Sequence, residues 1–248
     1  MSAPGIHPLA AMIDAFSVHT AICNEERAAF LDSPYSIRTF DPGSYLVREG
    51  DTSDQCRVVI TGFAVRHKIS GEGLRQIVSI YTNGDVLGLH HLYIGTADHN
   101  IQTLTRCTIA AIPTKALREL SLRYTTVGDA LFTHTLLEAS RYRESMLNVG
   151  RRDARTRLAH LLCELAVRLD VSGLPPGQGY ELPMTQEELG DTVGLTPVHV
   201  SRTLRALVED GLIVRDKRGL KFPDWARLIE AGDFNSRYLH LTQSDATD

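Results

Sequence analysis

The stretch MTQEELGDTVGLTPVHVSRTLRALVEDGLI, residues 184–213, carries the signals for two short helices joined by a tight turn. Thr185, with a glutamate three residues later, forms a capping box of the kind that begins a helix. Gly194 stands where a tight turn between helices favours a residue without a Cβ. Thr196 is expected to cap the second helix, which then starts at Pro197. A proline is well tolerated there, because its missing N–H would have no partner inside the helix.

The second of these helices is amphipathic. Its apolar face, which should be buried, consists of Val200, Leu204 and Leu207. Its other face carries Val198, His199, Ser201, Arg202, Arg205 and Glu209. The chain continues DGLIVRDKRGLKF, which predicts two short strands about a turn at Lys217, Arg218 and Gly219. Together these parts predict a winged helix-turn-helix, a fold that places its second helix in the major groove of DNA.

Residues 35–112 have the pattern of an all-β domain. The runs YLVREG, CRVVITGFAVRHKI, LRQIVSIY and IQTLTRCTIAAI alternate or are rich in β-branched residues. The segments DPG, EGD, SGEG and NGD between them are typical of turns. Several short strands at regular spacing predict a β-sandwich or a barrel-like roll.

Residues 125–170 predict helix, because they contain no proline and their only glycines are Gly128 and Gly150. Apolar residues recur at intervals of seven, as in a short coiled coil. They are Phe132, Ala139 and Met146 in one row, and Tyr142 and Val149 in another. We interpret this stripe as a dimer interface; the alternative is that it packs on the β-domain of the same chain. A second helix follows Gly150, and SGLPPGQG at residues 172–179 predicts a loop.

The composition is that of a soluble globular protein. The 248 residues are 43% hydrophobic and 23% charged, and no stretch approaches the ~20 apolar residues of a membrane span. No signal peptide is recognisable, and four widely spaced cysteines suit a reducing compartment, so we expect a cytoplasmic protein. The segments MSAPG at the start and TQSDATD at the end are expected to be disordered.

The formal net charge is −4, yet basic residues gather in two segments. Residues 196–222 hold six Lys and Arg against three acidic residues. Residues 141–157 hold six arginines against Glu144 and Asp153. We therefore expect two local basic patches that can face phosphates despite the negative total.

The order of these parts resembles the CRP/FNR family of bacterial transcription regulators. The runs DPGSYLVREGD, VVITGFAVRHKI and YTNGDVLGL resemble the family's β-roll, and residues 184–213 resemble its DNA-binding motif. The resemblance implies an α+β fold with an N-terminal, jelly-roll-like β-roll sensor domain, a long dimerisation helix and a C-terminal winged helix-turn-helix. The expected boundaries are an extension at residues 1–24, a cyclic-nucleotide-binding-like domain at 25–124, the dimerisation helix at 125–150, the winged helix at 151–225 and a tail at 226–248.

The resemblance implies a homodimeric transcriptional regulator that reads a two-fold related site in double-stranded DNA. The helix of residues 196–208 would lie in the major groove. Arg202 matches an arginine retained in the family and is the first candidate for contact with guanine. Ser201, which matches a serine of FNR-like members, and His199 are the next candidates. The expected phosphate contacts are Thr196, Arg205, Lys217 and Arg218.

Two positions of the reading helix depart from the family pattern. CRP-like members carry an arginine and a glutamate on the first turn, and FNR-like members carry a glutamate, whereas this chain has Pro197 and Val198. A valine accepts no hydrogen bond from cytosine but can contact a thymine methyl group. We therefore expect half-sites different from those usual in either subfamily; the alternative is that Val198 is an exposed spacer.

The sensor region departs from the family as well. Cyclic-nucleotide-binding members hold the phosphate with an arginine followed by Ser or Thr, and the ribose with a glutamate, after the GD turn. Residues 84–105 contain no Arg, Lys or Glu, so a buried cyclic phosphate would lack a charge partner. We expect weak or no binding of cyclic AMP in that mode. An iron–sulfur cluster is not expected either, because only Cys23 lies near the N-terminus.

Three histidines, His90, His91 and His99, are the candidates for contact with an effector. Imidazoles near Asp98 could bind a transition metal, and a histidine could ligate haem. Their spacing matches no zinc motif, and the simpler alternative is that they are polar loop residues. We prefer a small organic ligand to metal or haem, and a regulator without a ligand is a third alternative.

Two other classes of function are alternatives to a DNA-binding regulator. One is a sensor module that binds a ligand, metal or haem and acts mainly through protein contacts, for example with RNA polymerase. The other is an enzyme. The sequence holds no G-x-S-x-G, no phosphate-binding glycine loop and no Cys/His pair in a suitable context, so we expect no enzymatic activity.

Overall fold

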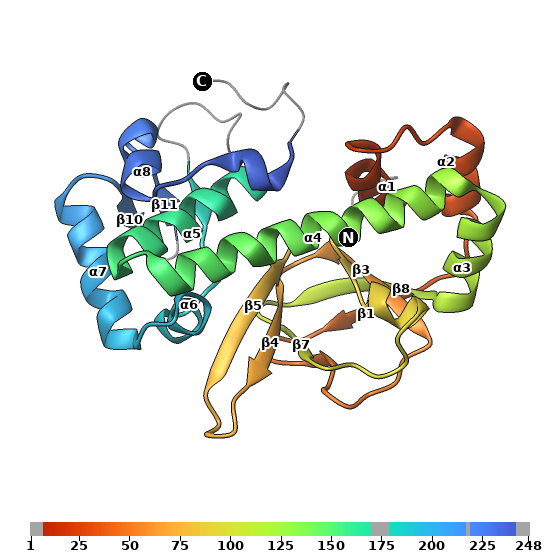
Figure 1. Cartoon of the computed structure of the whole chain (residues 1–248), viewed down its shortest axis with the longest axis horizontal. Helices are drawn as coiled ribbons and strands as arrows, with labels where there is room; N and C mark the ends of the chain where they lie inside the picture. Colours follow the sequence, from red (N-terminus) through yellow and green to blue (C-terminus); the bar gives the residue numbers. More distant parts are fainter. Residues whose placement is uncertain (1–6, 170–178, 217–218, 242–248) are drawn as a thin grey trace. The chain divides into compact units, whose positions relative to one another are not determined.

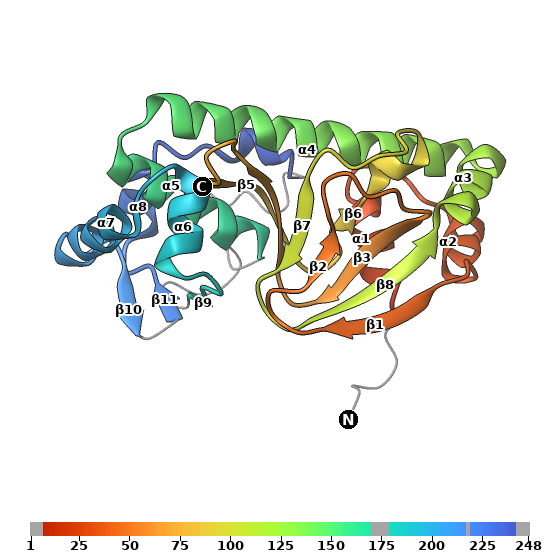
Figure 2. The ribbon, with the colours of Figure 1, turned by 90° about the horizontal axis from the view of Figure 1, so that it is seen from below.

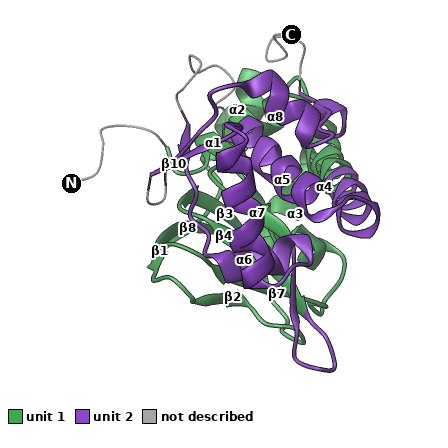
Figure 3. Cartoon of the chain, turned by 90° about the vertical axis from the view of Figure 1, so that its left-hand side faces the viewer, with its two compact units in different colours: residues 1–68, 79–138 green, residues 69–78, 139–248 purple. Residues whose placement is uncertain are grey.

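The computed structural model describes residues 7–169, 179–216 and 219–241. The chain, whose ribbon is drawn in Figure 1, divides into two compact units, one of residues 1–68 and 79–138 and the other of residues 69–78 and 139–248 (Figure 3). Both terminal segments expected to be disordered, nearly all of the loop at 172–179, and Lys217 and Arg218 lie outside the described residues.

Two four-stranded antiparallel sheets form the β-roll (Figure 2). One sheet has the order β1 (Ser36–Phe40), β8 (Cys107–Pro113), β3 (Gln55–Thr61) and β6 (Val86–Leu87). The other has the order β2 (Tyr45–Val47), β7 (Asn100–Thr103), β4 (Ala64–Ile69) and β5 (Arg75–Tyr81), of which residues 75–78 are counted with the second unit. The strands expected within residues 35–112 are therefore confirmed.

The central strands β3 and β8 bury residues on both faces of their sheet, whereas the edge strand β1 is mostly exposed. Val58 and Ala110 are register partners in one core cluster, whereas Val59 and Ile109 belong to a second cluster. The turn at Gly62 has φ +94°, and a Cβ there would lie 2.4 Å from the carbonyl oxygen of Arg106. Only glycine suits this position, because it tolerates the left-handed backbone and leaves room for the neighbouring strand.

Helices cover one of these two cores. They are α1 (Ala10–Ser17), α2 (Asn24–Leu31) and α3 (Thr114–Arg123). The apolar face of α1 is part of the core, since Met12 and Ile13 are fully buried and Phe16 stacks edge-on against Phe30. The segment read from the sequence as an N-terminal extension therefore supplies core residues to the first unit.

The long helix α4 (Thr125–Arg151) belongs to the first unit as far as residue 138 and to the second unit beyond it. The second unit continues with α5 (Ala154–Arg168), α6 (Gln186–Val193) and α7 (Pro197–Glu209). A three-stranded sheet of β9 (Tyr180–Glu181), β11 (Gly219–Lys221) and β10 (Val214–Asp216) completes the winged helix. The predicted α+β architecture of β-roll, long helix and winged helix-turn-helix is confirmed.

Helical structure continues beyond residue 225, into the segment read from the sequence as a tail. Residues read as a tail form α8 (Trp225–Ala231) and the short 3₁₀ helix η2 (Ser236–Leu239). Leu228, Phe234 and Leu239 are buried there. Among the described residues, no helix combines the length and the apolar character needed to cross a membrane.

Two leucines of α3 offer a matched test of the core. Leu117 is fully buried, whereas Leu122 is 78% exposed. We expect Leu117→Ala to lower the free energy of unfolding by about 2–5 kcal/mol, because it removes buried methyl groups and leaves a cavity. Leu122→Ala should change it by less than about 0.5 kcal/mol. Denaturant unfolding of both variants measures the difference, and equal losses would contradict the core assignment.

Candidate nucleic-acid interface

The turn between α6 and α7 is held by the caps that the sequence predicts. Thr185 caps α6: its hydroxyl accepts a hydrogen bond from the Glu188 amide at 3.2 Å, and the Glu188 carboxylate accepts from the Thr185 amide at 2.7 Å. Gly194 ends α6 with φ 68° and ψ 42°. Thr196 caps α7, with Pro197 at its first position. These local predictions are confirmed.

A second glycine, which the sequence analysis did not single out, brings the two helices together. A Cβ on Gly190 would lie 2.3 Å from the carbonyl oxygen of Leu195. The Leu195 amide in turn donates to the Gly190 carbonyl at 3.0 Å. Gly190 therefore lets α6 approach the start of α7 at backbone contact, which sets where the reading helix begins.

Side chains from distant parts of the sequence brace the C-terminal end of α6. The Arg75 Nε lies 2.6 Å from the Asp191 carboxylate, and the Gln76 amide donates to the carbonyls of Asp191 and Thr192 at 2.7 and 3.1 Å. Arg157 donates to the Val193 carbonyl at 3.2 Å. Gln76 and Arg157 thus satisfy carbonyls that a helix end leaves unpaired, while Arg75 bonds the Asp191 side chain. No sequence signal identified Arg75 or Gln76 in this role.

The two faces of α7 differ sharply in exposure. Val200, Leu204 and Leu207 are at most 2% exposed and hold the helix against the unit. Val198 is 72% exposed, and Arg202 and Arg205 are exposed one and two turns along. The predicted partition of this helix into a core face and an outward face is confirmed.

The outward face borders a concave pocket of about 410 Å³. Its lining comes from α7 and from the first residue of α6: Gln186, Pro197, Val198, Ser201, Arg202 and Arg205. Gln186 was missed by the sequence analysis, although the capping box places it at the exposed start of a helix. The pocket combines two guanidinium groups, an amide and a hydroxyl with the apolar surface of Pro197 and Val198.

His199 is less free than its position on the outward face suggests. Its amide donates to the Thr196 hydroxyl at 3.3 Å, and its ring Nδ1 lies 3.3 Å from the same oxygen. The ring therefore adjoins the helix cap and contributes to the local structure of the first turn.

The predicted basic hairpin is present as β10 and β11, in which Arg215 pairs in register with Leu220. Arg215 and Lys221 are exposed on it. Lys217 and Arg218, the expected phosphate contacts at its turn, lie outside the described residues.

Of the two expected basic patches, the one at residues 141–157 is partly neutralised inside the chain. Arg152 pairs with Glu144 at 2.7 Å, and Arg155 pairs with Asp210 at 2.6 Å. Arg157 donates to the carbonyls of Arg152 and Val193. Half of the six arginines thus serve the fold, so the expectation of a free basic surface there was too broad. A count of charges along the sequence cannot reveal ion pairs with residues that are distant in sequence, such as the pair of Arg155 with Asp210.

The three histidines of the sensor region do come together. His90 and His91 lie in the 3₁₀ helix η1 (Leu89–Leu92), and their ring centroids are 4.0 Å apart. The ring of His99 lies 4.8 Å from that of His90, and its Nδ1 is 2.7 Å from the Asp98 carboxylate. Burial lowers the pKa of all three, that of His90 to about 4. All three rings are therefore neutral near pH 7.

This cluster is not arranged as a metal site. Within residues 7–169, 179–216 and 219–241, no three His, Cys, Asp or Glu side chains are placed to hold a metal ion. Arg66 adds positive charge beside His90 and His99, and it lies 3.0 Å from Glu138, which also accepts from the Tyr81 hydroxyl at 2.6 Å. The charge that Arg66 brings to the cluster is therefore balanced by Glu138.

Of the five apolar residues predicted as the dimer stripe of α4, only two are largely exposed. Phe132 is 64% and Met146 is 76% exposed, whereas Ala139, Tyr142 and Val149 are half-buried. A methyl carbon of Val149 lies 3.2 Å from where a Cβ of Gly194 would be, so this side chain meets the turn before α7. Leu136 and Leu147, which the sequence analysis left out, are 52% and 45% exposed.

Two family models match separate parts of this chain. The family model for the cyclic nucleotide-binding domain matches residues 37–124, and that for the Crp-like helix-turn-helix domain matches residues 156–231. The transcriptional activator protein FnrL of Cereibacter sphaeroides is 33% identical over 218 residues, 86% of this chain and 87% of FnrL. The nitrogen fixation regulation protein FixK of Rhizobium meliloti is 28% identical over 191 residues, 76% of this chain and 83% of FixK.

Among solved structures, FixK2 from Bradyrhizobium japonicum has the same fold, with a TM-score of 0.74 at 24% identity over 80% of this chain and 97% of that chain. A β-roll, a long helix and a winged helix-turn-helix with an exposed reading face define a class of DNA-binding transcriptional regulators. The similarity to FnrL then identifies the family: this chain belongs to the Crp/Fnr family. That family consists of regulators rather than enzymes.

Two glycines test the close contact of α6 and α7. Gly190→Ala should lower the unfolding midpoint and weaken DNA binding, because its Cβ would overlap the Leu195 carbonyl. Gly150→Ala is the control, because it lies in α4 with nothing within 4 Å of an added Cβ. It should be neutral or stabilise by up to about 1 kcal/mol. Thermal unfolding and gel-shift titration measure both; a well-folded, fully binding Gly190→Ala variant would refute the contact.

Proposed function

We propose that the chain acts as a homodimer in which α7 of each copy enters the major groove of a two-fold related DNA site. The observation that carries this proposal is the outward face of α7, where Arg202 and Arg205 border an open pocket beside exposed Val198. A regulator of this kind works where the DNA is, so we place it in the cytoplasm.

Arg202 is the proposed base-reading residue. A guanidinium one turn into a major-groove helix can bond guanine O6 and N7 together, which is the commonest specific contact. Ser201 lines the same pocket, and the Gln186 amide adds a donor and an acceptor from α6. Val198 offers only methyl groups, which suit a thymine. The half-site should therefore combine a guanine opposite Arg202 with a thymine methyl near Val198.

The proposed phosphate contacts are spread around this pocket. Arg205 lies further along α7, and Arg215 and Lys221 are exposed on the hairpin. Thr196 lies at the N-terminus of α7, where backbone N–H groups favour an anion. Such contacts set the affinity and its salt dependence rather than the sequence preference. The negative net charge does not oppose this, because none of the described residues that line the pocket beside α7 is acidic.

The proposed dimer interface follows the exposed stripe of α4. Phe132, Leu136, Met146 and Leu147 recur at helical spacing and are each at least 45% exposed. Large apolar side chains exposed in a row on one helix are favourably buried by a second copy. We therefore revise the predicted interface to include Leu136 and Leu147 and to leave out Val149.

We propose that the regulating signal acts at the β-roll, with His90, His91 and His99 as the residues nearest to it. The Nε2 atoms of His90 and His99 are buried without a hydrogen-bond partner among the described residues. Neutral imidazoles beside Arg66 fit a small uncharged or anionic molecule better than a metal ion. A protein output, such as contact with RNA polymerase, is compatible with DNA binding and would be a second function of the bound dimer.

Selection of bound sequences from a random DNA pool tests the reading surface. We expect Arg202→Ala to lose about 1–3 kcal/mol of discrimination at one base pair per half-site, since it removes a bidentate base contact. Arg205→Ala is the control: it should weaken binding about equally to all sequences and reduce the slope of log affinity against log salt by about 1. A uniform loss in both variants would contradict base reading by Arg202.

The dimer interface is tested by adding charge to the stripe. Met146→Glu should convert dimers to monomers, because two carboxylates would face the apolar interface, and affinity for the two-fold site should fall with it. Leu122→Glu, at a residue of α3 that is 78% exposed, is the control and should stay dimeric. Size-exclusion chromatography with light scattering distinguishes the states; intact Met146→Glu dimers would place the interface elsewhere.

A further inference from the structure

The chain continues past the end of the family's helix-turn-helix match at residue 231 and folds back onto α4 and α5. We call residues 232–240 the C-terminal strap. Its backbone adopts the left-handed region at Asp233, φ 45°, and again at His240, φ 52°. Such conformations are uncommon for residues other than glycine and persist where surrounding contacts hold them.

The first contact of the strap is with the junction between α4 and α5. Helix α4 ends at Arg151, and Asp153 caps α5 by accepting from the amides of Arg155 and Thr156. Arg152 lies between them, and its side chain is 9% exposed. This junction joins the proposed dimer helix to the DNA-binding part of the chain.

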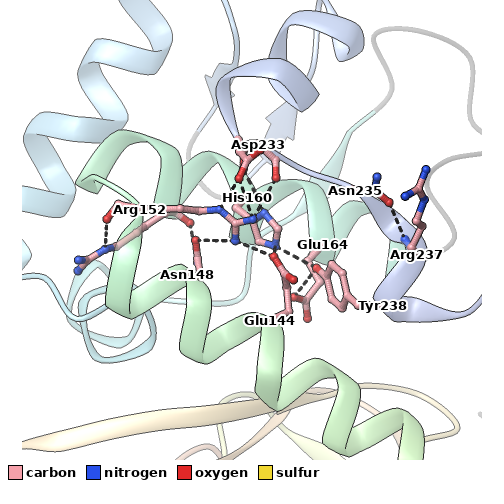
Figure 4. Close-up of polar contacts among 11 residues, drawn as sticks. Glu144, Asn148, Arg152, His160, Glu164, Asp233, Asn235, Arg237 and Tyr238 are labelled. Atoms are coloured by element: carbon pink, nitrogen blue, oxygen red, sulfur yellow. Dashed lines mark hydrogen bonds and ion pairs between the residues drawn. The ribbon is translucent and has the colours of Figure 1, made fainter.

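The guanidinium of Arg152 is held from two sides (Figure 4). It lies 2.7 Å from the Glu144 carboxylate of α4, and on the strap it bonds the Asp233 carboxylate at 3.0 Å and the Asp233 carbonyl at 3.1 Å. A guanidinium donates in a rigid planar fork, so two acceptors at different positions fix its direction as well as its charge. Arg152 therefore ties the junction to α4 and the strap together.

A second set of contacts joins the strap to α5. His160 is 1% exposed, with Nδ1 3.1 Å from the Gly232 carbonyl and Nε2 3.1 Å from the Tyr238 hydroxyl. That hydroxyl donates to Glu164 at 2.8 Å, and the Tyr238 ring stacks on the imidazole at 19° between planes. Gly232 must stay small, because a Cβ there would lie 2.9 Å from the His160 amide nitrogen.

The far end of the strap returns to α4. The His240 ring Nε2 lies 3.4 Å from the hydroxyl of Ser140, which is itself buried. The strap thus contacts α4 directly at Ser140 and indirectly through Arg152, which bonds Glu144 of that helix. It contacts α5 at His160, through Gly232 and Tyr238. Three attachments on two helices are enough to define the angle between the helices.

From this arrangement we propose that the C-terminal strap is a positioning element that fixes the angle between α4 and α5 and so sets which half-site spacing the dimer accepts. The inference rests on the proposed function, because the spacing matters only if two copies read one DNA site. Asp233 and Tyr238 act through Arg152 and His160, and neither touches DNA in this scheme. Breaking the strap leaves the reading face of α7 unchanged but lets the junction adopt a range of angles.

The contacts of the strap serve to fix the orientation of the α4–α5 junction rather than to stabilise the fold. The Arg152–Glu144 pair is mostly buried, with side chains 9% and 18% exposed, whereas the Asp233 carboxylate on the strap is 74% exposed. Exposed ion pairs contribute little to stability. Buried ion pairs also contribute little net stability after the cost of removing both charges from water, although removing one partner is costly. Their well-attested use is to specify one arrangement among several of similar energy. Two-fold DNA sites place half-sites about 10–10.5 base pairs apart, so a change of junction angle alters which spacing both reading helices can reach together.

The test uses the full-length protein and a series of two-fold DNA sites in which the half-site separation changes by one base pair at a time. The half-site sequence is the one that the wild-type protein selects. The variants are Asp233→Asn, which tolerates the left-handed backbone, and Tyr238→Phe, which keeps the stacked ring but lacks the hydroxyl. Arg237→Ala, an exposed residue of the same strap, is the matched control.

We expect the wild-type protein and Arg237→Ala to share one spacing, preferred over its neighbours by tenfold or more in affinity. Asp233→Asn and Tyr238→Phe should reduce that preference at least fivefold while selecting the same half-site sequence. An unchanged spacing preference in both variants would overturn the proposal, even if their unfolding midpoints fall, because a merely stabilising strap would not alter spacing.

Hydrogen exchange of the full-length protein tests, without DNA, whether the strap holds the α4–α5 junction rigid. Amides at the start of α5 should exchange about tenfold faster in Asp233→Asn than in the wild type and at the wild-type rate in Arg237→Ala. Equal rates in all three would overturn the rigid junction. If the wild-type protein selects no DNA sequence at all, the proposed function fails, and faster exchange in Asp233→Asn would still show that the strap holds the junction.

Discussion

The reading face of α7 depends on the burial of its opposite face. Leu204 and Leu207 lie against the second unit with almost no exposed surface, so the helix cannot rotate without exposing them. Because α-helical side chains repeat every 3.6 residues, this burial also fixes the direction of Val198, Arg202 and Arg205. Gly190 sets the position of the helix along its axis, and the Thr196 cap sets where it begins.

Charge in this protein is a matter of distribution rather than of total. The chain as a whole is acidic, but four basic side chains are exposed on the reading surface, Arg202 and Arg205 on α7 and Arg215 and Lys221 on the hairpin. Arginines at the α4–α5 junction are instead paired with Glu144, Asp210 and Asp233. The same residue type therefore has two uses, one in holding the fold and one in facing a polyanion, and only the contacts tell them apart.

Local features of the fold could be read from the sequence, whereas features that join distant segments could not. Thr185, Gly194 and Pro197 act within a few residues of themselves, so their roles follow from helix geometry. Arg75 bonds Asp191, more than a hundred positions away, and no local pattern marks that pair. The strap was missed because its buried residues are few and lack a regular period.

The same limit applies to the candidate sites. The outward face of α7 was predictable because one amphipathic helix defines it. Gln186 joins the pocket only through the packing of α6 on α7, which the sequence does not show directly. On α4, the seven-residue interval includes Val149, whose methyl carbon meets the position of a Gly194 Cβ, and it leaves out Leu136 and Leu147, which are exposed.

The strap has a practical consequence for anyone who isolates the DNA-binding part of this protein. The family match covers residues 156–231, so a fragment cut at those limits would begin after Arg152 and end before Asp233. It would keep the reading helix but expose His160 and Glu164, which the strap covers. A fragment from Ser140 to His240 would keep the reading helix and also the strap that covers His160 and Glu164. It should be the more soluble of the two fragments.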